Sequence, residues 1–371
     1  MLGMQDGVIT MAHGSGGASS AELMRRVFQK HFNGEILGRL EDAAVVDLAS
    51  GRVAVSTDTF VVTPLIFSGG DIGKLAVCGT VNDILMSGAE PRYLTCGFIL
   101  ETGLPIDLLD KICASLAEAA VEAGVTIIAG DTKVIEGRME GGGLIINTTG
   151  IGVFRQKGDV PCVRKANQKT KGDVPCVREA NHDTTEPSPC LAAPSGIRPG
   201  DDIIVSGNLG DHHAAILSAR MGIKNNIQSD CAILTPVISA LREDGIEIHA
   251  MRDVTRGGLA TVLNELAAAS GVSIELEEET IPVSPEVRAF CGIMGLDPLY
   301  MGNEGKMALA VAPEDADRAL AAIQSTEIGR DAAIIGKAEE NKTECDVTMR
   351  TRIGGTVRLD VLYGEGLPRI C

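Results

Sequence analysis

The sequence has no tryptophan and few aromatic residues of any kind, which make up 3% of its 371 residues. Hydrophobic residues still reach 44%, so we expect a real interior built from Val, Ile, Leu and Ala. No apolar run approaches the roughly 20 residues of a membrane span. Positive charge is also scarce, with 33 Lys and Arg against 50 Asp and Glu. The resulting net charge of −17 argues against binding to nucleic acid or to an anionic membrane.

The length, the N-terminal residues and the cysteine content indicate the number of domains and the cellular compartment. A chain of 371 residues exceeds one average hydrophobic core, which predicts two domains. Residues 1–12 have no basic start followed by an apolar run, so we expect no signal peptide and a cytoplasmic protein. In that compartment the ten cysteines are expected to be mostly free thiols.

Strand and helix patterns alternate along most of the chain. Residues 105–123 give the clearest helix, with Pro105 in the first turn and Gly124 as terminator. The other helices are expected at 71–87, 211–221, 257–269 and 314–325. Strands are expected at 43–48, 52–56, 125–129, 144–154, 202–206, 306–312, 332–337 and 356–362. The alternation predicts a mixed α/β fold of the α+β type.

A tandem repeat interrupts this alternation at residues 156–195. The segment KGDVPCVRKANQKT is followed by KGDVPCVREANHDT and a decayed third copy, and it has little apolar content. Its evenly spaced cysteines are Cys162, Cys176 and Cys190. They could bind a metal, but duplication alone explains their spacing and no close Cys pair is present. We interpret the segment as an inserted linker. It separates two α/β domains, 1–155 and 196–357, and a C-terminal strand and mobile tail follow at 358–371.

Glycines near the start of the chain and scattered aspartates point to a nucleotide site. The residues Gly14, Ser15, Gly16 and Gly17 precede a helix expected to start near Ser19, where backbone N–H groups can meet phosphate oxygens. Aspartates also recur just before, within or just after apolar segments, at positions 42, 58, 83, 131 and 253. A single such aspartate is usually a cap or turn residue. Asp83 lies within a mostly apolar helix, where a buried carboxylate needs a partner. Several carboxylates brought together would need a cation, and Mg²⁺ with ATP is the natural one.

Several motifs occur in a fixed order along the chain. They are DAA (42–44), STD (56–58), GDIGKLAVCGTVNDILMSGAEP (70–91), AGDTKV (129–134), DVTRGGLATVLNE (253–265) and GNEGK (302–306). Together they resemble the aminoimidazole ribonucleotide synthetase-related ATP-binding superfamily over nearly all the chain except residues 156–195. Within it, the ending GEGLPRIC (364–371) is similar to that of the carbamoyl dehydratases of hydrogenase maturation. The resemblance implies ATP and Mg²⁺ as cofactors, with residues 1–155 as the ATP-binding and dimerisation domain.

The resemblance also implies roles for individual residues. The expected Mg²⁺ ligands are Asp42, Asp58, Asp83 and Asp253. The nucleotide would be bound by Gly14, Ser15, Gly16, Gly17, Asp58, Asn82, Asp83, Asp131 and Asp253. Lys133 would stabilise charge on a phosphorylated oxygen, and Glu265 would accept an amide proton. The residue pattern alone has simpler interpretations for these two, a solvated turn residue and an exposed helix position.

The last residue, Cys371, is the expected carrier of the substrate. A partner carbamoyltransferase would load a carbamoyl group onto its thiol, and ATP-dependent dehydration would turn that group into a thiocyanate. The cyano group would pass to an iron-carrying scaffold of the HypC–HypD type for a [NiFe]-hydrogenase. The eight residues 364–371, with two glycines and a proline, span roughly 26–29 Å when extended, which is enough to move the thiol between sites.

Two other interpretations remain open at this stage. A small-molecule ATP kinase of the same superfamily would keep its turnover when Cys371 is deleted. A nucleotide-switched thiol or metal scaffold would bind metal at the repeat cysteines and leave Cys371 unmodified. By analogy with the superfamily, a homodimer is expected.

Overall fold

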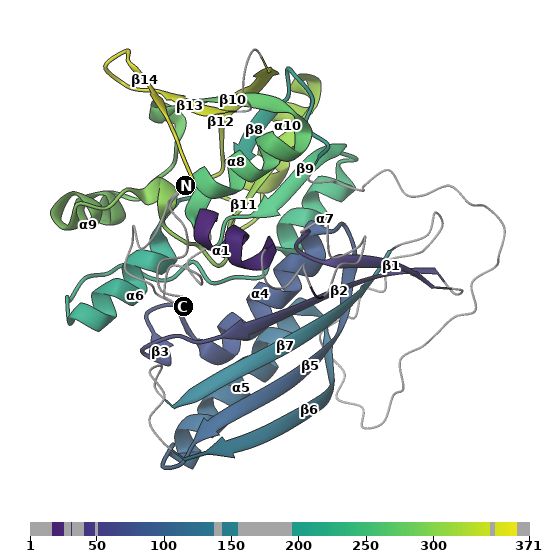
Figure 1. Cartoon of the computed structure of the whole chain (residues 1–371), viewed down its shortest axis with the longest axis vertical. Coiled ribbons are helices and arrows are strands. Elements are labelled where there is room, and N and C mark those ends of the chain that lie inside the picture. Colours follow the sequence, from purple (N-terminus) through teal and green to yellow (C-terminus); the bar gives the residue numbers. More distant parts are fainter. Residues whose placement is uncertain are drawn as a thin grey trace.

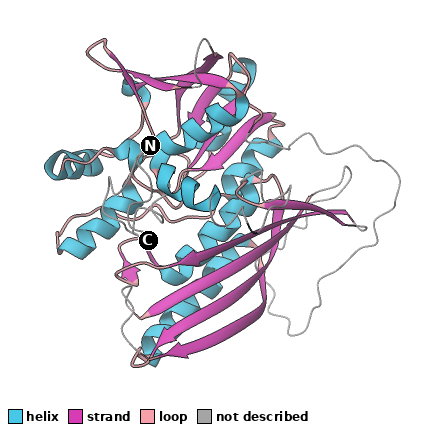
Figure 2. Cartoon of the chain, viewed as in Figure 1, coloured by secondary structure: helices cyan, strands magenta, loops and turns pink. Residues whose placement is uncertain are grey.

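The computed structural model of the protein describes residues 17–25, 31, 41–48, 51–136, 143–154, 195–341 and 346–361. These residues form two main sheets with helices packed against them (Figure 1). Figure 2 shows the strands in two separate groups with helices lying between them. This arrangement confirms the expected mixed α/β class. No helix in these ranges is both long enough and apolar enough to cross a bilayer.

The N-terminal sheet has five strands in the order β1-β2-β7-β5-β6. Neighbouring strands run antiparallel except β5 and β6, which are parallel. The strands are β1 (Ala44–Leu48), β2 (Gly51–Phe60), β5 (Glu90–Glu101), β6 (Thr126–Ile135) and β7 (Leu144–Val153). One face is covered by α4 (Ile72–Met86), against which α5 (Ile106–Ala123) packs. A short helix, α1 (Gly17–Leu23), precedes the sheet, and a two-stranded hairpin pairs β3 (Ile66–Phe67) with β4 (Gly70–Asp71).

The C-terminal sheet has seven strands in the order β14-β13-β10-β12-β8-β11-β9. Its strands are β8 (Asp202–Val205), β9 (Ile248–Asp253), β10 (Val272–Glu277), β11 (Met307–Val311), β12 (Ala333–Glu340), β13 (Val347–Arg350) and β14 (Thr356–Arg358). Its helices are α6 (Asp211–Met221), α7 (Thr235–Glu243), α8 (Gly258–Ser270), α9 (Pro285–Met294) and α10 (Pro313–Gln324). Two 3₁₀ turns, η3 (Glu278–Thr280) and η4 (Pro298–Tyr300), complete this part.

One hydrophobic core joins the two sheets. It contains residues of α4 and β5 together with residues of α7, β9 and β11. A second core lies on the opposite face of the C-terminal sheet and is capped by α8. Because β9 contributes Met251 to the first core and Ala250 to the second, successive residues of this strand face opposite layers. This alternation decides which site residues meet.

Helix α5 begins and ends where the sequence predicts, and Gly124 closes it in a left-handed conformation with φ 71°. Two strand ends differ from the prediction. β2 continues to Phe60 and β6 to Ile135, so Asp58 and Asp131 lie within strands rather than after them. Six of the ten added residues, 57–60 and 130–135, are Thr, Val, Ile or Phe, which favour extended backbone.

Some elements have no counterpart in the sequence prediction. β5 is the longest strand of its sheet, although Pro91 and Gly97 interrupt its pattern. The backbone of β5 forms hydrogen bonds with β7 on one side and β6 on the other, and the local sequence does not predict this pairing. The residues Gly14, Ser15, Gly16, Cys371 and the cysteines of the repeat lie outside the described ranges.

Candidate active site

Helix α4 places a carboxylate at the boundary between the two halves of the protein. Almost every residue of α4 is buried, because the N-terminal sheet packs on one side and the C-terminal elements on the other. Asp71 caps its start by accepting hydrogen bonds from the backbone N–H groups of Gly73 and Lys74, at 2.7 and 3.0 Å. Near its other end, Asp83 accepts a hydrogen bond of 2.6 Å from the Ser56 hydroxyl on β2. The helix therefore holds an ionisable group inside an apolar layer.

Asp58 on β2 faces the same helix. A Cβ atom at Gly79 would lie 4.0 Å from Asp58 Oδ2 and only 2.8 Å from the Phe60 ring. The strand can approach α4 this closely because position 79 is glycine. Gly79 and Asp83 are four residues apart on one face of α4, so the carboxylates of Asp58 and Asp83 border the same space.

The third carboxylate comes from the C-terminal half. Asp253 is the last residue of β9, is 6% exposed, and lies on the side of the strand that faces α4. The chain then turns into α8 through Gly257 and Gly258, both with positive φ, at 83° and 66°. The start of this 13-residue helix thus follows directly on the acidic site.

Burial and, after it, mutual repulsion make these carboxylates difficult to ionise together. Burial, followed by the charge of Asp42 and opposed by Arg252, raises the pKa of Asp253 to about 8. Burial together with the charges of Asp253 and Asp58 raises the pKa of Asp83 well above its ordinary value. Asp42, in the segment before β1, also has a raised pKa, mainly because it is buried. A bound cation would relieve this repulsion, and oxygen-only donors are those that Mg²⁺ prefers.

Glu304 adds a further carboxylate that the sequence analysis did not single out. Burial and the charges of Asp253 and Asp230 raise its pKa well above the ordinary value. Its backbone N–H donates to Asp230 Oδ1 at 3.0 Å, which fixes the loop that carries it. The only signal available in the sequence was its place in the motif GNEGK, where it stands between two glycines.

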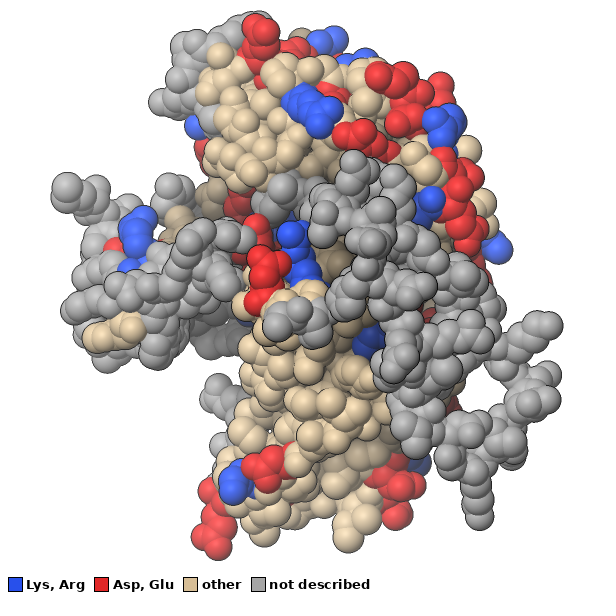
Figure 3. Space-filling model, turned by 90° about the vertical axis from the view of Figure 1, so that its right-hand side faces the viewer, with Lys and Arg blue, Asp and Glu red and all other residues tan. Residues whose placement is uncertain are grey.

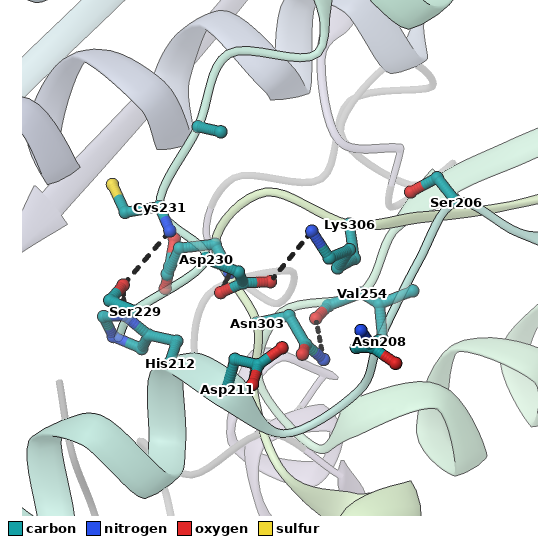
Figure 4. Close-up of polar contacts among 12 residues, drawn as sticks. Ser206, Asn208, Asp211, His212, Ser229, Asp230, Cys231, Val254, Asn303 and Lys306 are labelled. Carbon is teal, nitrogen blue, oxygen red and sulfur yellow. Dashed lines mark hydrogen bonds and ion pairs between the residues drawn. The ribbon is translucent and has the colours of Figure 1, made fainter. Parts of the chain in front are cut away.

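A network of buried polar groups holds this loop (Figure 4). Asn303 is fully buried, accepts a hydrogen bond from the N–H of Gly210 and donates to the carbonyls of Val254 and Met301. The Nζ atom of Lys306 lies 3.9 Å from Asp230 Oδ2. Since Val254 follows Asp253 directly, the network ties the loop of Glu304 to the end of β9.

Arg252 connects parts of the site that are distant in sequence. Its Nε lies 2.9 Å from Asp42 Oδ1 and its Nη1 lies 2.8 Å from Glu265 Oε2 on α8. Neighbouring acidic groups, Asp42 first, raise the pKa of Arg252 even though burial opposes its charge. The sequence offered one hint, a charged residue inside the buried strand IHAMRD.

The side chain of Asn82 forms hydrogen bonds with backbone groups of the C-terminal half. Its side-chain amide donates to the carbonyl of Ala232 at 3.0 Å and accepts from the N–H of Leu234 at 2.9 Å. These bonds fasten α4 to the segment before α7. Its side chain is thus committed to backbone groups, and contact with phosphate or metal stays a prediction.

Asp131 and Lys133 lie apart from the other site residues within one chain. Both are on the exposed strand β6, which is three strand spacings, about 14 Å, from β2. Asp131 pairs with Gly97 and lies on the sheet face opposite Cys96, which belongs to the core beneath the sheet. Asp58 faces α4 instead. The structure therefore does not bring Asp131 and Lys133 together with the carboxylates of the same chain.

The remaining predicted residues are distributed as follows. Glu265 has a 43% exposed side chain and contacts Arg252 rather than solvent alone. Gly17 begins α1 with a positive φ of 71°. Within the described ranges, no three His, Cys, Asp or Glu side chains lie close enough to bind a metal by themselves. A Mg²⁺ ion bound here would have to take water or phosphate oxygens among its ligands.

Comparison with known protein families agrees with this two-domain architecture. Residues 40–154 match the domain described as "AIR synthase related protein, N-terminal domain", and residues 198–347 match "AIR synthase related protein, C-terminal domain". A chain with both domains and an acidic site at their boundary is a protein of the AIR synthase-related class.

Relatives that match nearly the whole chain identify the family within this class. The chain is 42% identical over 370 residues to carbamoyl dehydratase HypE of Escherichia coli K12, covering 98% of this chain and 99% of the relative. A crystal structure of the hydrogenase maturation protein HypE with ATP superposes with a TM-score of 0.75 at 41% identity, covering 98% and 100%. A HypE–HypF complex gives a TM-score of 0.78 at 40% identity, covering 92% and 99%. The chain belongs to the HypE family of carbamoyl dehydratases.

Proposed function

We propose that this protein uses ATP to dehydrate a carbamoyl group on the Cys371 thiol to a thiocyanate. The product would supply the cyano ligand of a [NiFe]-hydrogenase iron. The observation that carries this proposal is the set of partly or fully buried, mutually repelling carboxylates of Asp58, Asp83 and Asp253 where the two domains meet. It occurs in a chain that matches carbamoyl dehydratases over its full length. A relative crystallised with ATP supports the nucleotide as co-substrate.

The chemistry needs a phosphate leaving group and two proton transfers. The carbamoyl oxygen attacks the γ-phosphorus of ATP, a C–O–P linkage forms, ADP leaves, and one amide proton goes to a base. The C–O bond then breaks, the second N–H proton leaves with the phosphate, and S–C≡N remains. Glu265 is our candidate for the base. Catalysis of phosphoryl transfer depends mainly on positioning and charge stabilisation, which suits a rigid acidic site.

Mg²⁺ is the cation that we propose for the site. Asp58, Asp83 and Asp253 would hold it, with Asp42 at the edge of the set. It would neutralise the phosphates and orient the γ-phosphoryl group. The glycine loop formed by residues 14–17 would cover the nucleotide.

Mass spectrometry of the C-terminal peptide tests the proposal. The protein is incubated with a HypF-type carbamoyltransferase, carbamoyl phosphate and ATP, and the mass of the Cys371 peptide is followed. We expect a carbamoyl adduct that loses one water when Mg²⁺ and ATP are present. The Cys371→Ser variant serves as the control that cannot be loaded. Wild-type Cys371 that stays unmodified, or an adduct that never loses water, would refute the proposal.

We also propose a homodimer that pairs chains along β6. All ten residues of this strand are exposed, including Ile128 at 53% and Val134 at 67%. An exposed, apolar edge strand has unpaired backbone groups and is a ready site for a second chain. The lower part of the molecule, where the N-terminal sheet lies, has large areas without charged side chains (Figure 3).

Light scattering after size exclusion tests the dimer. Ile128→Lys places a charge on the exposed edge and should shift the mass from dimer to monomer. Ile293→Lys changes an isoleucine that is 85% exposed on α9 and should leave the dimer intact. Equal masses for wild type and Ile128→Lys would contradict pairing along β6.

In such a dimer, Lys133 and Asp131 would serve the site of the neighbouring subunit. Within one chain they lie on the outer side of the sheet, away from Asp83. Mixing Lys133→Ala chains with Asp83→Asn chains separates the alternatives. If Lys133 acts across the interface, half of the chains form mixed dimers with one intact site, and about a quarter of wild-type activity returns. If Lys133 acts within its own chain, every site carries a defect and no activity returns.

Other partners follow from the proposed chemistry. The HypE–HypF complex supports a partner of the HypF kind for loading the thiol. An iron-carrying scaffold of the HypC–HypD type would accept the cyano group. We expect all of these steps in the cytoplasm.

A further inference from the structure

The proposed dehydration reaction assigns no role to Arg252. It lies on β9 next to Asp253, but successive strand residues face opposite layers. Asp253 therefore faces α4, while Arg252 faces α8. Its side chain is 21% exposed, so the guanidinium is largely withdrawn from water.

The ion pairs of Arg252 divide the acidic residues into two groups. The first group lies at one face of α4 and consists of Asp58, Asp83 and Asp253. The electrostatic interactions among these three carboxylates are repulsive. Asp42 and Glu265 share the single guanidinium of Arg252, at 2.9 and 2.8 Å. One carboxylate of this second group comes from the N-terminal half and the other from the C-terminal half.

We propose that Arg252 is a positioning residue: its bridge to Asp42 fixes Glu265 at the domain boundary and keeps Glu265 out of the cation-binding carboxylates. The inference rests on the proposed function of Glu265 as the acceptor of the amide proton. A carboxylate bound to a divalent cation is a poor base, so the site needs a means of reserving one. A guanidinium does this through its contacts with Asp42 and Glu265, while its charge also acts on Asp253 next to it.

Arginine is specifically suited to this task. Its planar fork has several N–H donors in fixed directions, so it can bind two carboxylates at once. Lysine carries the same charge on a single ammonium group and lacks this planar fork. The Arg252→Lys variant therefore keeps the positive charge but loses the bridge between the two carboxylates, whereas Arg252→Gln removes the charge.

The test combines a binding measurement with kinetics on the full-length protein. Mn²⁺ is titrated without nucleotide and followed by electron paramagnetic resonance, and dehydration of carbamoylated Cys371 is measured with ATP. We expect Arg252→Gln to bind Mn²⁺ about tenfold more tightly, because a nearby positive charge is gone. Its kcat should fall about a hundredfold with little change in KM for ATP, since Glu265 is no longer held. Arg252→Lys should keep wild-type Mn²⁺ affinity and still lose at least about tenfold in kcat.

The control is Arg350→Gln, which removes an arginine paired with Glu275 and Glu277 on the far strands of the C-terminal sheet. It should change neither measurement. An unchanged kcat in Arg252→Gln would overturn the proposal. Weaker Mn²⁺ binding in both Arg252 variants, in parallel with kcat, would also overturn it, because Arg252 would then only support the fold. If wild-type protein fails to dehydrate Cys371, the proposed function fails, whereas normal wild-type turnover together with an unchanged kcat in Arg252→Gln overturns this inference alone.

Discussion

Replacing Asp253 by asparagine removes one buried carboxylate while keeping its shape. In the native protein burial and neighbouring charge raise the pKa of Asp253 to about 8, against an ordinary value of 3.8. The native state therefore holds a proton between these pH values that the unfolded chain has already lost. Stability must fall as the pH rises through this window, by about 1.4 kcal/mol per pH unit for one group.

The size of the effect follows from that slope. Between pH 5 and pH 8 the wild type should lose up to about 4 kcal/mol through Asp253, and Asp253→Asn should lack this loss. Urea unfolding at both pH values, in EDTA, measures the difference. Asp47→Asn, on a side chain that is 84% exposed, is the control and should follow the wild type.

Added Mg²⁺ extends the same experiment. The cation should stabilise the wild type at pH 8, where ionised carboxylates are available to bind it, and should stabilise Asp253→Asn much less. If the wild-type and Asp253→Asn stabilities change in parallel with pH, Asp253 does not have the raised pKa that burial and the neighbouring Asp42 cause. The reasoning on the cation site would then be refuted.

Three other predictions concern single side chains of the same region. Ser56→Ala removes the hydroxyl that donates to Asp83 and should weaken Mg²⁺ binding about tenfold by calorimetry, and equal affinity would contradict it. Asn303→Ala breaks three buried hydrogen bonds and should lower the free energy of unfolding by about 3 kcal/mol, whereas Asn208→Ala, with one exposed bond, should cost less than about 1 kcal/mol. Burial lowers the pKa of His212 to about 3, so His212 by itself should lower the stability of the wild type by about 2 kcal/mol from pH 7 to pH 5, as the unfolded chain gains a proton. His212→Gln should lose less over that range, and identical pH curves would argue against the buried neutral imidazole.

The order of motifs along the chain was enough to predict the class of fold, the family and the chemistry. Helix α5 shows why local prediction succeeds, because Pro105, the apolar spacing and Gly124 all act within one helix. Asp83 was also recognisable, since a carboxylate in an apolar helix needs a partner wherever the helix lies.

Tertiary structure decided which residues meet. The local sequence does not predict β5, because hydrogen bonds to β7 and β6 stabilise this strand rather than its own residue pattern. The ion pairs of Arg252 join residues that are 210 and 13 positions away in sequence, at Asp42 and Glu265. The alternation of side chains across a strand then separates Arg252 from Asp253, although they are adjacent. Sequence alone therefore named Asp42, Asp58, Asp83, Asp253 and Glu265 but not Glu304, and only the packing of α4, β9 and α8 assigned each of them a neighbour.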